Sequence, residues 1–576
     1  MRSLTPGLGL SLLSLVAAAP SPSPIESRQN NTPKNCNKAF FDNVVAQLKL
    51  GGSVDSRSPY TPNSEPFTAG RDPYRERVLY YANNDTPLRI SDICGLRVNV
   101  VDNIAFELYL PSPETWNQRF LTVGNGGFAG GASRKDMFSR VVQNWATMST
   151  NTGHDDPSLM LNWGAGTAGK KLQIDWAYRA MNLSVPYAKA IVAAYYGADK
   201  KTKGSYYSGC STGGRQGIRQ VEIDPKSFDA MLIGAPAWNI KSFSAVLSRI
   251  GYLAETSGLK VRLREATPTV LDRIWTLVYK ECDGLDGSTA DGVILNRDAC
   301  YARFRNQAEN TTLWANTDTT VQQRKAFLTI IEEFKNPKVP EFVGHGFDIT
   351  AIRDLGSSSY LMDKLDNLDF TQQFAQYFLN NPSLKWDTDD NGAALIAASE
   401  AWNKEVLANA DPSVLSPGGK YTGKTILYTG TSDGFVSSAG TRRAFDLAGG
   451  KDNTNLAYFE IPGMPHCVDL GSGAVNPPWY IGGGGLHMPY PNSVYYMPES
   501  AGLQNPKNDA LLALVDWVEQ KGNTGPETLV ATAFKTWGDG KFEVAKSRPV
   551  CRFPKQLRLV EGKNVNAVEG WECTVV

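Results

Sequence analysis

The sequence of 576 residues has no excess of either charge, because 58 lysines and arginines balance 58 aspartates and glutamates. Without a basic surplus to offset phosphates, a nucleic-acid-binding protein is not expected, and there is no polybasic patch suited to a membrane surface. Beyond the N-terminus, no stretch approaches about 18 uninterrupted apolar residues, so no membrane-spanning helix is predicted. Histidine is scarce: only four occur, which leaves few candidates for a catalytic base.

The N-terminus has the features of a secretory signal peptide, assigned to residues 1–19. A basic start is followed by a short apolar stretch, residues 4–16, and by three alanines that suit cleavage. Eight cysteines, an even number, are typical of an oxidising compartment. The mature protein is therefore expected to be soluble and extracellular. Four Asn-x-Ser/Thr sequons add weak support for a secreted glycoprotein, at Asn30, Asn84, Asn182 and Asn310.

The chain is long enough for two domains, or for one domain with a large insertion. Strand-like apolar runs alternate with helical patterns towards both ends, which predicts a mostly parallel sheet covered by helices. The predicted strands are residues 104–110, 119–123, 205–208, 230–233, 425–429 and 456–461. The predicted helices are residues 176–196, 271–280 and 508–521. Pro186 is expected to break the first of these helices or to start a second segment.

Residues 237–410 lack this alternation. They contain helical segments, many aromatic residues and little β-α order. We interpret them as an inserted lid domain over the sheet. The catalytic domain would then consist of residues 37–236 and 411–576.

A nucleophile elbow is predicted at residues 209–213, where Gly-Cys-Ser-Thr-Gly matches the G-x-S-x-G pattern. A serine in this pattern occupies a strained turn between a strand and a helix, and small neighbours let the backbone turn sharply. Residues 430–434, Gly-Thr-Ser-Asp-Gly, match as well. The pattern alone is weak, because either site could be an ordinary glycine-rich turn.

Chain order favours Ser211 over Ser432 as the nucleophile. An α/β-hydrolase triad runs Ser, then Asp or Glu, then His. With Ser211 as nucleophile, Asp433 follows a predicted strand and precedes His466, which suits an orienting acid. With Ser432 as nucleophile, the acid would have to come from the short stretch before the histidine.

His466 is the preferred general base among the four histidines. A lone histidine is more often structural than catalytic, so additional signals are needed. His345 lies in the predicted insertion, and His154 precedes Ser211, which breaks the expected order. His487 keeps the order but has no neighbouring cysteine, so it ranks second.

Two cysteines flank the proposed nucleophile and base, since Cys210 precedes Ser211 and Cys467 follows His466. A disulfide between them would place their Cα atoms roughly 4.4–6.8 Å apart. One trans peptide spans about 3.8 Å, so the Cα atoms of serine and histidine would lie within about 14 Å. This arrangement predicts a serine hydrolase. A cysteine nucleophile at position 210 is the chemical rival.

The segment at residues 124–129, Gly-Asn-Gly-Gly-Phe-Ala, follows a predicted strand and formally matches a dinucleotide-binding fingerprint. That interpretation needs an acidic residue about 20 positions later, and none is there. We favour a turn that supplies a backbone N–H to the oxyanion hole. The predicted donors are the amides of Gly127 and Thr212.

An acidic loop at residues 283–293 carries Asp283, Asp286 and Asp291 between glycines. Hard oxygen ligands at such spacing suit Ca²⁺, although the loop does not fit EF-hand spacing. The alternative is a solvated acidic turn.

The run Gly-Cys-Ser-Thr-Gly-Gly-Arg-Gln-Gly at residues 209–217, followed by Asp433 and then His466-Cys467, resembles the tannase and feruloyl esterase family of secreted hydrolases. The resemblance covers residues 36–573. It implies an α/β-hydrolase core with a large inserted lid domain. It also implies Ser211 as nucleophile, His466 as general base, Asp433 as orienting carboxylate, and a disulfide between Cys210 and Cys467.

The resemblance further implies a structural calcium site in the lid, with the three aspartates and two backbone carbonyls, here near Ser288 and Val293, as ligands. This chain has one extra residue between Asp286 and Asp291. Cys282 and Cys300 would bracket the loop. The remaining disulfides would be Cys36–Cys94 and Cys551–Cys573, the last by resemblance alone.

The expected function is hydrolysis of plant phenolic esters through an acyl-enzyme. The preferred substrates are feruloyl or coumaroyl esters of cell-wall polysaccharides, which places the protein in xylan degradation. A tannase acting on galloyl esters is the alternative. A catalytically silent secreted binding protein on a hydrolase scaffold is the second alternative.

Overall fold

The computed structural model places residues 32–576 in one compact unit. The described residues are 35–49, 51–55, 93–141, 143–157, 160–197, 199–259, 269–287, 291–351, 370–387, 389–467, 479–482, 503–520, 522–538 and 541–575. The predicted signal peptide, the sequons at Asn30 and Asn84, the loop residue Ser288 and the rival base His487 lie outside them. No helix in the described part is long and apolar enough to cross a membrane.

A nine-stranded mixed sheet forms the centre of this unit, in the order β1-β2-β3-β5-β4-β6-β7-β10-β11. The strands from β5 to β11 in this order pair in parallel, whereas β1, β2 and β3 are antiparallel to their neighbours. The strands are β1 Ser53–Val54, β2 Cys94–Val101, β3 Ile104–Leu110, β4 Arg119–Val123, β5 Ala146–Thr150, β6 Gly204–Cys210, β7 Ala230–Gly234, β10 Lys424–Gly430 and β11 Leu456–Ile461.

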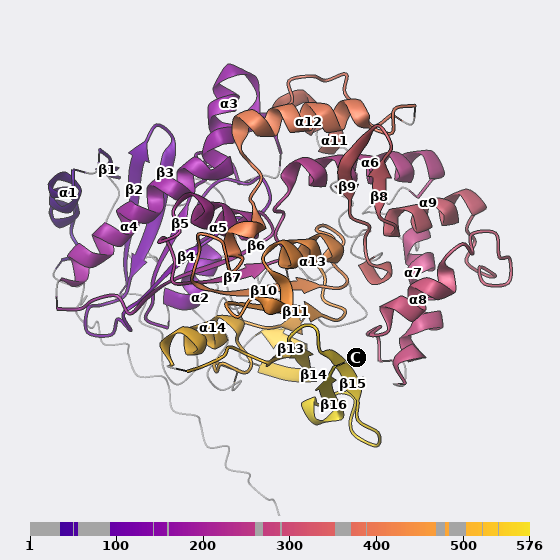
Figure 1. Cartoon of the computed structure of the whole chain (residues 1–576). Coiled ribbons are helices and arrows are strands. Elements are labelled where there is room, and N and C mark those ends of the chain that lie inside the picture. Colours follow the sequence, from indigo (N-terminus) through magenta and orange to yellow (C-terminus); the bar gives the residue numbers. More distant parts are fainter. Residues whose placement is uncertain are drawn as a thin grey trace, which may run out of the picture. The chain divides into compact units, whose positions relative to one another are not determined.

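Helices cover both faces of the sheet (Figure 1). On one face, buried residues of α1, α4, α5 and α13 share a hydrophobic cluster with the strands; α2 and α14 do so on the other. The central strands are buried along almost their whole length, as expected for a sheet covered on both sides. These helices are α1 Lys38–Gln47, α2 Arg134–Val141, α4 Ala180–Tyr196, α5 Thr212–Ile223, α13 Ser438–Leu447 and α14 Ala510–Glu519.

The chain between β7 and β10 is mainly helical and adds no described strand to the large sheet (Figure 1). Its helices share a separate hydrophobic cluster, which also includes Phe128 and Trp176 from the first half of the chain. Whether this segment is a lid domain stays a prediction. Its elements are α6 Ile240–Ser257, α7 Val270–Cys282, α8 Arg297–Phe304, α9 Val321–Ile331, β8 Phe334–Asn336, β9 Val339–Gly344, α11 Phe370–Gln373 and α12 Ala393–Val406.

Pro186 does not break its helix. Helix α4 runs from Ala180 to Tyr196 with the proline inside it, and α3 Gly166–Ile174 leads into it through a π-helical turn, Asp175–Arg179. The expected break is therefore wrong. A proline removes only one backbone hydrogen bond, and the buried face of α4 against the sheet outweighs that loss.

Antiparallel strands follow near the C-terminus. One three-stranded sheet contains β12 Trp479–Tyr480, β13 Thr528–Gly538 and β14 Lys541–Cys551. A two-stranded ribbon contains β15 Gln556–Leu559 and β16 Trp571–Thr574.

The parallel strands of the large sheet share one carboxyl edge, where β6, β10 and β11 end, so residues that follow these strands can meet there.

Candidate active site

Ser211 lies at the turn between β6 and α5, as the elbow pattern predicts. Its φ of 63° and ψ of −125° are rare for a residue with a β-carbon. Backbone bonds secure the turn: Ser211 N–H donates to Gly234 O at 3.0 Å, and Ala237 N–H donates to Ser211 O at 3.1 Å. A strained conformation held by neighbouring strands is typical of a nucleophile elbow.

The glycines of the elbow permit a close approach of two backbone segments. A β-carbon on Gly124 would lie 2.6 Å from the Cα of Gly213, and one on Gly213 would lie 3.0 Å from Asn125 O. Any larger residue would push the loop after β4 away from the start of α5. The last glycine of the G-x-S-x-G pattern therefore serves to bring these two segments together.

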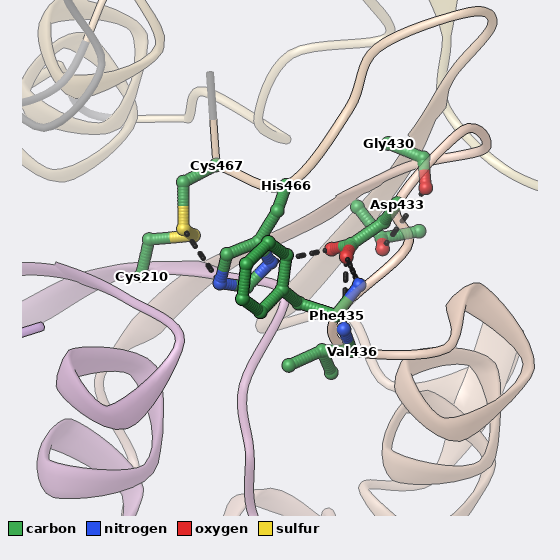
Figure 2. The surroundings of a disulfide bond; sticks show 8 residues. Cys210, Gly430, Asp433, Phe435, Val436, His466 and Cys467 are labelled. Atoms are coloured by element: carbon green, nitrogen blue, oxygen red, sulfur yellow. Dashed lines mark hydrogen bonds and ion pairs between the residues drawn. A yellow bond between two sulfur atoms is a disulfide. The ribbon is translucent and has the colours of Figure 1, made fainter. Parts of the chain in front are cut away.

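Asp433 is held rigidly in the turn after β10 and is only 1% exposed. Its Oδ1 accepts hydrogen bonds from the amides of Phe435, at 2.9 Å, and Val436, at 2.8 Å. Its Oδ2 lies 2.8 Å from Nδ1 of His466. Figure 2 shows the carboxylate and the imidazole facing each other. This contact favours the tautomer with the proton on Nδ1, which leaves Nε2 as the basic nitrogen.

The predicted disulfide joins Cys210 to Cys467, with Cα atoms 5.9 Å apart. Nε2 of His466 lies 3.6 Å from Sγ of Cys467, so the basic nitrogen faces the disulfide (Figure 2). The Cα atoms of Ser211 and His466 are therefore within about 13.5 Å of each other. The described contacts include no hydrogen bond between the Ser211 hydroxyl and Nε2; such bonds are often long before substrate binds.

The surroundings of the disulfide are apolar. Cys210 and Cys467 form a buried cluster with Ala235, Ala237 and Val436, and Phe243 and Phe435 pack against it. The Phe435 ring stacks on the imidazole of His466, with ring centroids 5.0 Å apart. Exclusion of water here strengthens the bond between imidazole and carboxylate.

The loop after β4 can provide the predicted oxyanion donor. The amide of Asn125 already donates to Gln216 Oε1 at 2.9 Å, and Gln216 Nε2 donates back to Asn125 Oδ1 at 3.3 Å. Gly127 has a φ of 54°, and no described group accepts a hydrogen bond from its amide. Thr212 is the first residue of α5, where amides precede the first intrahelical bond. The pairing of these two amides around an oxyanion stays a prediction.

Basic side chains from β14 contact the acidic loop. The Arg548 guanidinium contacts the carboxylate of Asp291, and Lys546 Nζ donates to Asp291 O at 2.7 Å. Asp283 accepts bonds from the amides of Gly292, at 2.8 Å, and Val293, at 3.1 Å. Burial raises the pKa of Asp283, although these two amide bonds oppose the shift.

The donor chemistry of this loop suits calcium, but the ligand set is incomplete in the described part. No described group of three or more His, Cys, Asp or Glu side chains is placed to hold a metal ion. Ser288, one of the expected ligands, lies outside the described residues. Binding of calcium at Asp283, Asp286, Asp291 and Val293 therefore stays a prediction.

The other described histidines make different contacts. His154 is 8% exposed and stacks on Trp163 with ring centroids 4.1 Å apart; burial lowers its pKa to about 4. His345 Nδ1 lies 4.0 Å from Oε2 of Glu333. The rival serine, Ser432, is buried beside the acid itself, at 7% exposure.

All four predicted disulfides are confirmed. Besides the bridge at the site, Cys36 joins Cys94, Cys282 joins Cys300, and Cys551 joins Cys573. Cys282 and Cys300 are 18 residues apart in sequence, and their bridge closes the segment that contains the acidic loop. No cysteine of the described chain is free. A free thiolate at Cys210 is thereby excluded from this structure.

A serine after β6, an acid after β10 and a histidine after β11, all at the carboxyl edge of the parallel strands, define an α/β-hydrolase. The family model described as "Tannase and feruloyl esterase" matches residues 96–574. The chain therefore belongs to the tannase and feruloyl esterase family of carboxylic ester hydrolases.

Relatives and solved structures agree with this membership. A protein from Aspergillus clavatus called "Probable feruloyl esterase B" is 28% identical over 84% of this chain and 86% of its own length. A "Probable feruloyl esterase B-1" from Neosartorya fischeri has the same identity and coverage. The crystal structure of feruloyl esterase B from Aspergillus oryzae covers 93% of this chain and 100% of its own, with a TM-score of 0.70 and 23% identity.

The structure of tannin acyl hydrolase from Aspergillus niger is also similar, with a TM-score of 0.65 and 18% identity over 94% of this chain and 96% of its own. At these identities both solved structures support the fold. They agree with the α/β-hydrolase core expected from the sequence.

Two contributors to the site were not expected from the sequence. Phe435 covers the imidazole of His466, and Gln216 fixes the loop that carries Gly127. An aspartate often accepts bonds from amides two and three residues later, so the sequence Asp-Gly-Phe-Val at 433–436 held a usable signal. No comparable local signal pointed to the bond between Gln216 and Asn125, which are 91 residues apart.

Proposed function

We propose that the protein is a secreted serine esterase that hydrolyses feruloyl or coumaroyl esters of plant cell-wall polysaccharides. The observation that carries the proposal is the bond between Asp433 and His466 beside the disulfide that holds Ser211 close by. Relatives of nearly the same length are called probable feruloyl esterases, which supports the choice of acyl group.

The reaction begins with proton transfer from the Ser211 hydroxyl to Nε2 of His466. The serine oxygen attacks the ester carbonyl, and the amides of Gly127 and Thr212 stabilise the negative oxygen of the tetrahedral intermediate. Asp433 keeps the proton on Nδ1 and stabilises the imidazolium as it forms. Its two amide bonds keep the carboxylate in place during this step.

The second half of the reaction regenerates the enzyme. His466 gives its proton to the leaving alcohol, and the acyl group remains on Ser211. Water then attacks the acyl-enzyme and gives a proton to His466; as the bond between the acyl carbon and Ser211 Oγ breaks, the imidazolium returns that proton to Oγ and the phenolic acid leaves. Each step needs only the three side chains and the backbone amides.

Hydrolysis of methyl ferulate, methyl caffeate and methyl gallate by the purified protein tests the substrate choice. We expect the highest kcat/KM on methyl ferulate. A higher value on methyl gallate would favour tannase, the second candidate, which the family shared with tannin acyl hydrolase supports. No turnover of any ester, together with no labelling by a fluorophosphonate, would favour a binding protein on a hydrolase scaffold.

Secretion is part of the proposal, and four disulfides support it because such bonds persist in oxidising compartments. The expected partner is insoluble plant cell-wall material. N-terminal sequencing of protein from a fungal culture medium would test it: the mature chain should begin after residue 19, with glycan on exposed Asn310. An uncleaved intracellular chain would contradict it.

We also propose that the acidic loop binds calcium. Asp283, Asp286 and Asp291 supply hard oxygen ligands, and the bonds donated by the amides of Gly292 and Val293 to Asp283 bring the two ends of the loop together. Calcium added after dialysis against a chelator should raise the melting temperature of the wild type, and Asp286→Asn should reduce the effect. Identical melting temperatures with and without calcium would contradict the proposal. Arg548, and not a calcium ion, would then balance the negative charge of the loop.

A further inference from the structure

A cavity lies beside the Asp433–His466 pair, past the carboxyl ends of β7 and β10. It measures about 490 Å³ out to its open mouth. Three parts of the chain line it: the loop after β7 with the start of α6, the end of β9 with the residues after it, and the turn from Phe435 to α13. The first two belong to the helical segment or border it, so the cavity lies where that segment meets the site.

The cavity wall is built from neighbours of all three proposed catalytic residues. Ala237 donates its amide to Ser211 O at 3.1 Å. Phe435 stacks on His466, and its amide donates to Asp433. Both Ala237 and Phe435 line the cavity. An ester whose carbonyl carbon is at Ser211 therefore has one of its two arms next to this opening.

The wall is largely aromatic and aliphatic. Trp238, Phe243, Phe347 and Phe435 contribute rings, and Val246, Leu247 and Val343 fill the spaces between them. Transfer of a sugar hydroxyl into such surroundings loses hydrogen bonds to water, whereas an aromatic ring gains from leaving water. The cavity therefore suits the aromatic acid of the ester better than its carbohydrate.

Few polar groups of the wall remain for a ligand. Asn239 Oδ1 already accepts bonds from the amide of Ser242 and from Asn409 Nδ2. Ser437 Oγ donates to Gly346 O, and the Trp238 indole N–H donates to Gly440 O at 3.0 Å. Among the described side chains of the wall, this leaves His345, the hydroxyl of Ser242 and the NH₂ group of Asn239.

His345 is suited to contact an uncharged hydroxyl. Burial lowers its pKa, Arg443 adds to the shift and Glu333 opposes it, so the imidazole is neutral near pH 7. A neutral ring offers one donor and one acceptor. Nδ1 is the nitrogen towards Glu333, at 4.0 Å from its carboxylate, which leaves Nε2 for a ligand.

We propose that this cavity is the acyl pocket of the enzyme and that His345 recognises the ring hydroxyl of a 4-hydroxyphenyl acyl group by a hydrogen bond. The proposal rests on the ester hydrolysis proposed above and names what selects its substrate. An acyl group without that hydroxyl would leave Nε2 of the half-buried imidazole without this hydrogen bond, which penalises its binding.

The test compares methyl 4-hydroxycinnamate with methyl cinnamate, two esters that differ only in the ring hydroxyl. For the wild type we expect a higher kcat/KM on the hydroxylated ester. In His345→Leu the ratio of the two kcat/KM values should fall by roughly 3- to 10-fold, the range for one neutral hydrogen bond. Ser242→Ala, which removes another polar group of the wall, is the matched control and should keep the ratio.

A second variant tests the location independently of the hydrogen bond. Val343→Phe adds bulk to the wall and should lower kcat/KM on both cinnamates relative to 4-nitrophenyl acetate, whose acyl group is too small to reach the pocket. Circular dichroism melting establishes that each variant is folded.

The outcomes separate the two proposals. If the wild type hydrolyses neither the acetate nor the cinnamates, ester hydrolysis itself fails. If it hydrolyses them and His345→Leu keeps the wild-type ratio, or Ser242→Ala alone lowers it, recognition by His345 is overturned while the esterase stands. If Val343→Phe spares the cinnamates, the cavity is not the acyl pocket.

Discussion

Ser211 combines the proposed nucleophile with a backbone conformation that is unfavourable for any residue with a β-carbon. Its φ of 63° and ψ of −125° lie in a region that only glycine adopts without steric cost. Strain of this kind costs on the order of 1–3 kcal/mol and is found mainly at functional sites. At this residue, activity and stability therefore make opposite demands.

Two substitutions separate the contribution of Ser211 to activity from its cost in stability. Ser211→Ala should lower kcat by about 10⁴-fold or more and leave the melting temperature near that of the wild type, because it removes the attacking oxygen and keeps the strain. Ser211→Gly should be equally inactive but more stable than the alanine variant, by about 1 kcal/mol. Ester turnover and thermal unfolding check both. Normal turnover by either variant would refute the assignment of Ser211 as the nucleophile. A glycine variant less stable than the alanine variant would refute the claim that the backbone of residue 211 is strained.

The carboxylate of Asp433 can be tested without disturbing its turn. In Asp433→Asn the amide oxygen can still accept from the amides of Phe435 and Val436, but an NH₂ group would face Nδ1 of His466. The proton is then forced onto Nε2, and kcat should fall by about 10³- to 10⁴-fold with little change in KM. The matched control is Asp446→Asn, an exposed carboxylate of α13. A loss below tenfold in the first variant would contradict the assigned role.

Residues of the site were predictable where chain order and a neighbouring cysteine restricted the choice. Asp433 and His466 could be selected because few histidines exist and each proposed residue follows a strand-like run. Phe435 and Gln216 could not, because their roles depend on contacts made only in the folded chain. The G-x-S-x-G pattern occurs twice: the first match contains the proposed nucleophile, Ser211, and the second contains the proposed acid, Asp433.

At the scale of elements, the disulfide between Cys210 and Cys467 links the elbow after β6 to the turn after β11. It spans a sequence separation of 257 residues. The chain-entropy model gives about 5 kcal/mol of stabilisation for a closed loop of this size. Because it also fixes His466 beside the elbow, its loss should affect catalysis as well as stability.

Removal of this bridge by Cys210→Ala with Cys467→Ala should lower both the melting temperature and kcat, measured where the variant is still folded. The control removes the Cys551–Cys573 bridge, which closes a separation of 22 residues in the C-terminal strands. That variant should lose about 3 kcal/mol of stability and keep its kcat. Equal kcat values for the two double variants would show that the bridge at the site serves stability alone.

Elements with strong periodicity were predicted well. Strands β3, β4 and β11 coincide with the predicted residues 104–110, 119–123 and 456–461. Strands buried on both faces give nearly continuous apolar runs, which are easy to recognise whether they pair in parallel, like β4 and β11, or antiparallel, like β3. The antiparallel strands β12 to β16 were not predicted. Strands β12, β15 and β16 are two to four residues long, and polar residues interrupt the apolar positions of the 11-residue strands β13 and β14. The helix through Pro186 shows packing overriding a local preference.

At the scale of the whole molecule, one buried histidine should contribute to acid sensitivity. His154 is buried and stacked on Trp163, and burial lowers its pKa from 6.5 to about 4. Above pH 6.5 the residue is neutral in folded and unfolded chains and has no effect. Below 6.5 the unfolded chain takes up the proton first, so stability falls until the folded chain also protonates near pH 4.

The expected loss from this group is up to about 3 kcal/mol between pH 6.5 and 4. His154→Phe keeps an aromatic ring against Trp163 and removes the titration, so its free energy of unfolding should fall less over this range than that of the wild type. Urea unfolding of both proteins at pH 7, 6, 5 and 4 measures the difference. Parallel curves for the two proteins would contradict the role of His154.

The proposed reaction makes Ser211, among all serines of the molecule, the one that becomes covalently modified. A fluorophosphonate reacts with a serine only when a base and an oxyanion hole activate it. Digestion of the labelled protein and mass spectrometry should place one adduct on the peptide with Ser211, with loss of esterase activity in proportion to labelling. An adduct on the peptide with Ser432, or continued activity of the fully labelled protein, would contradict the account.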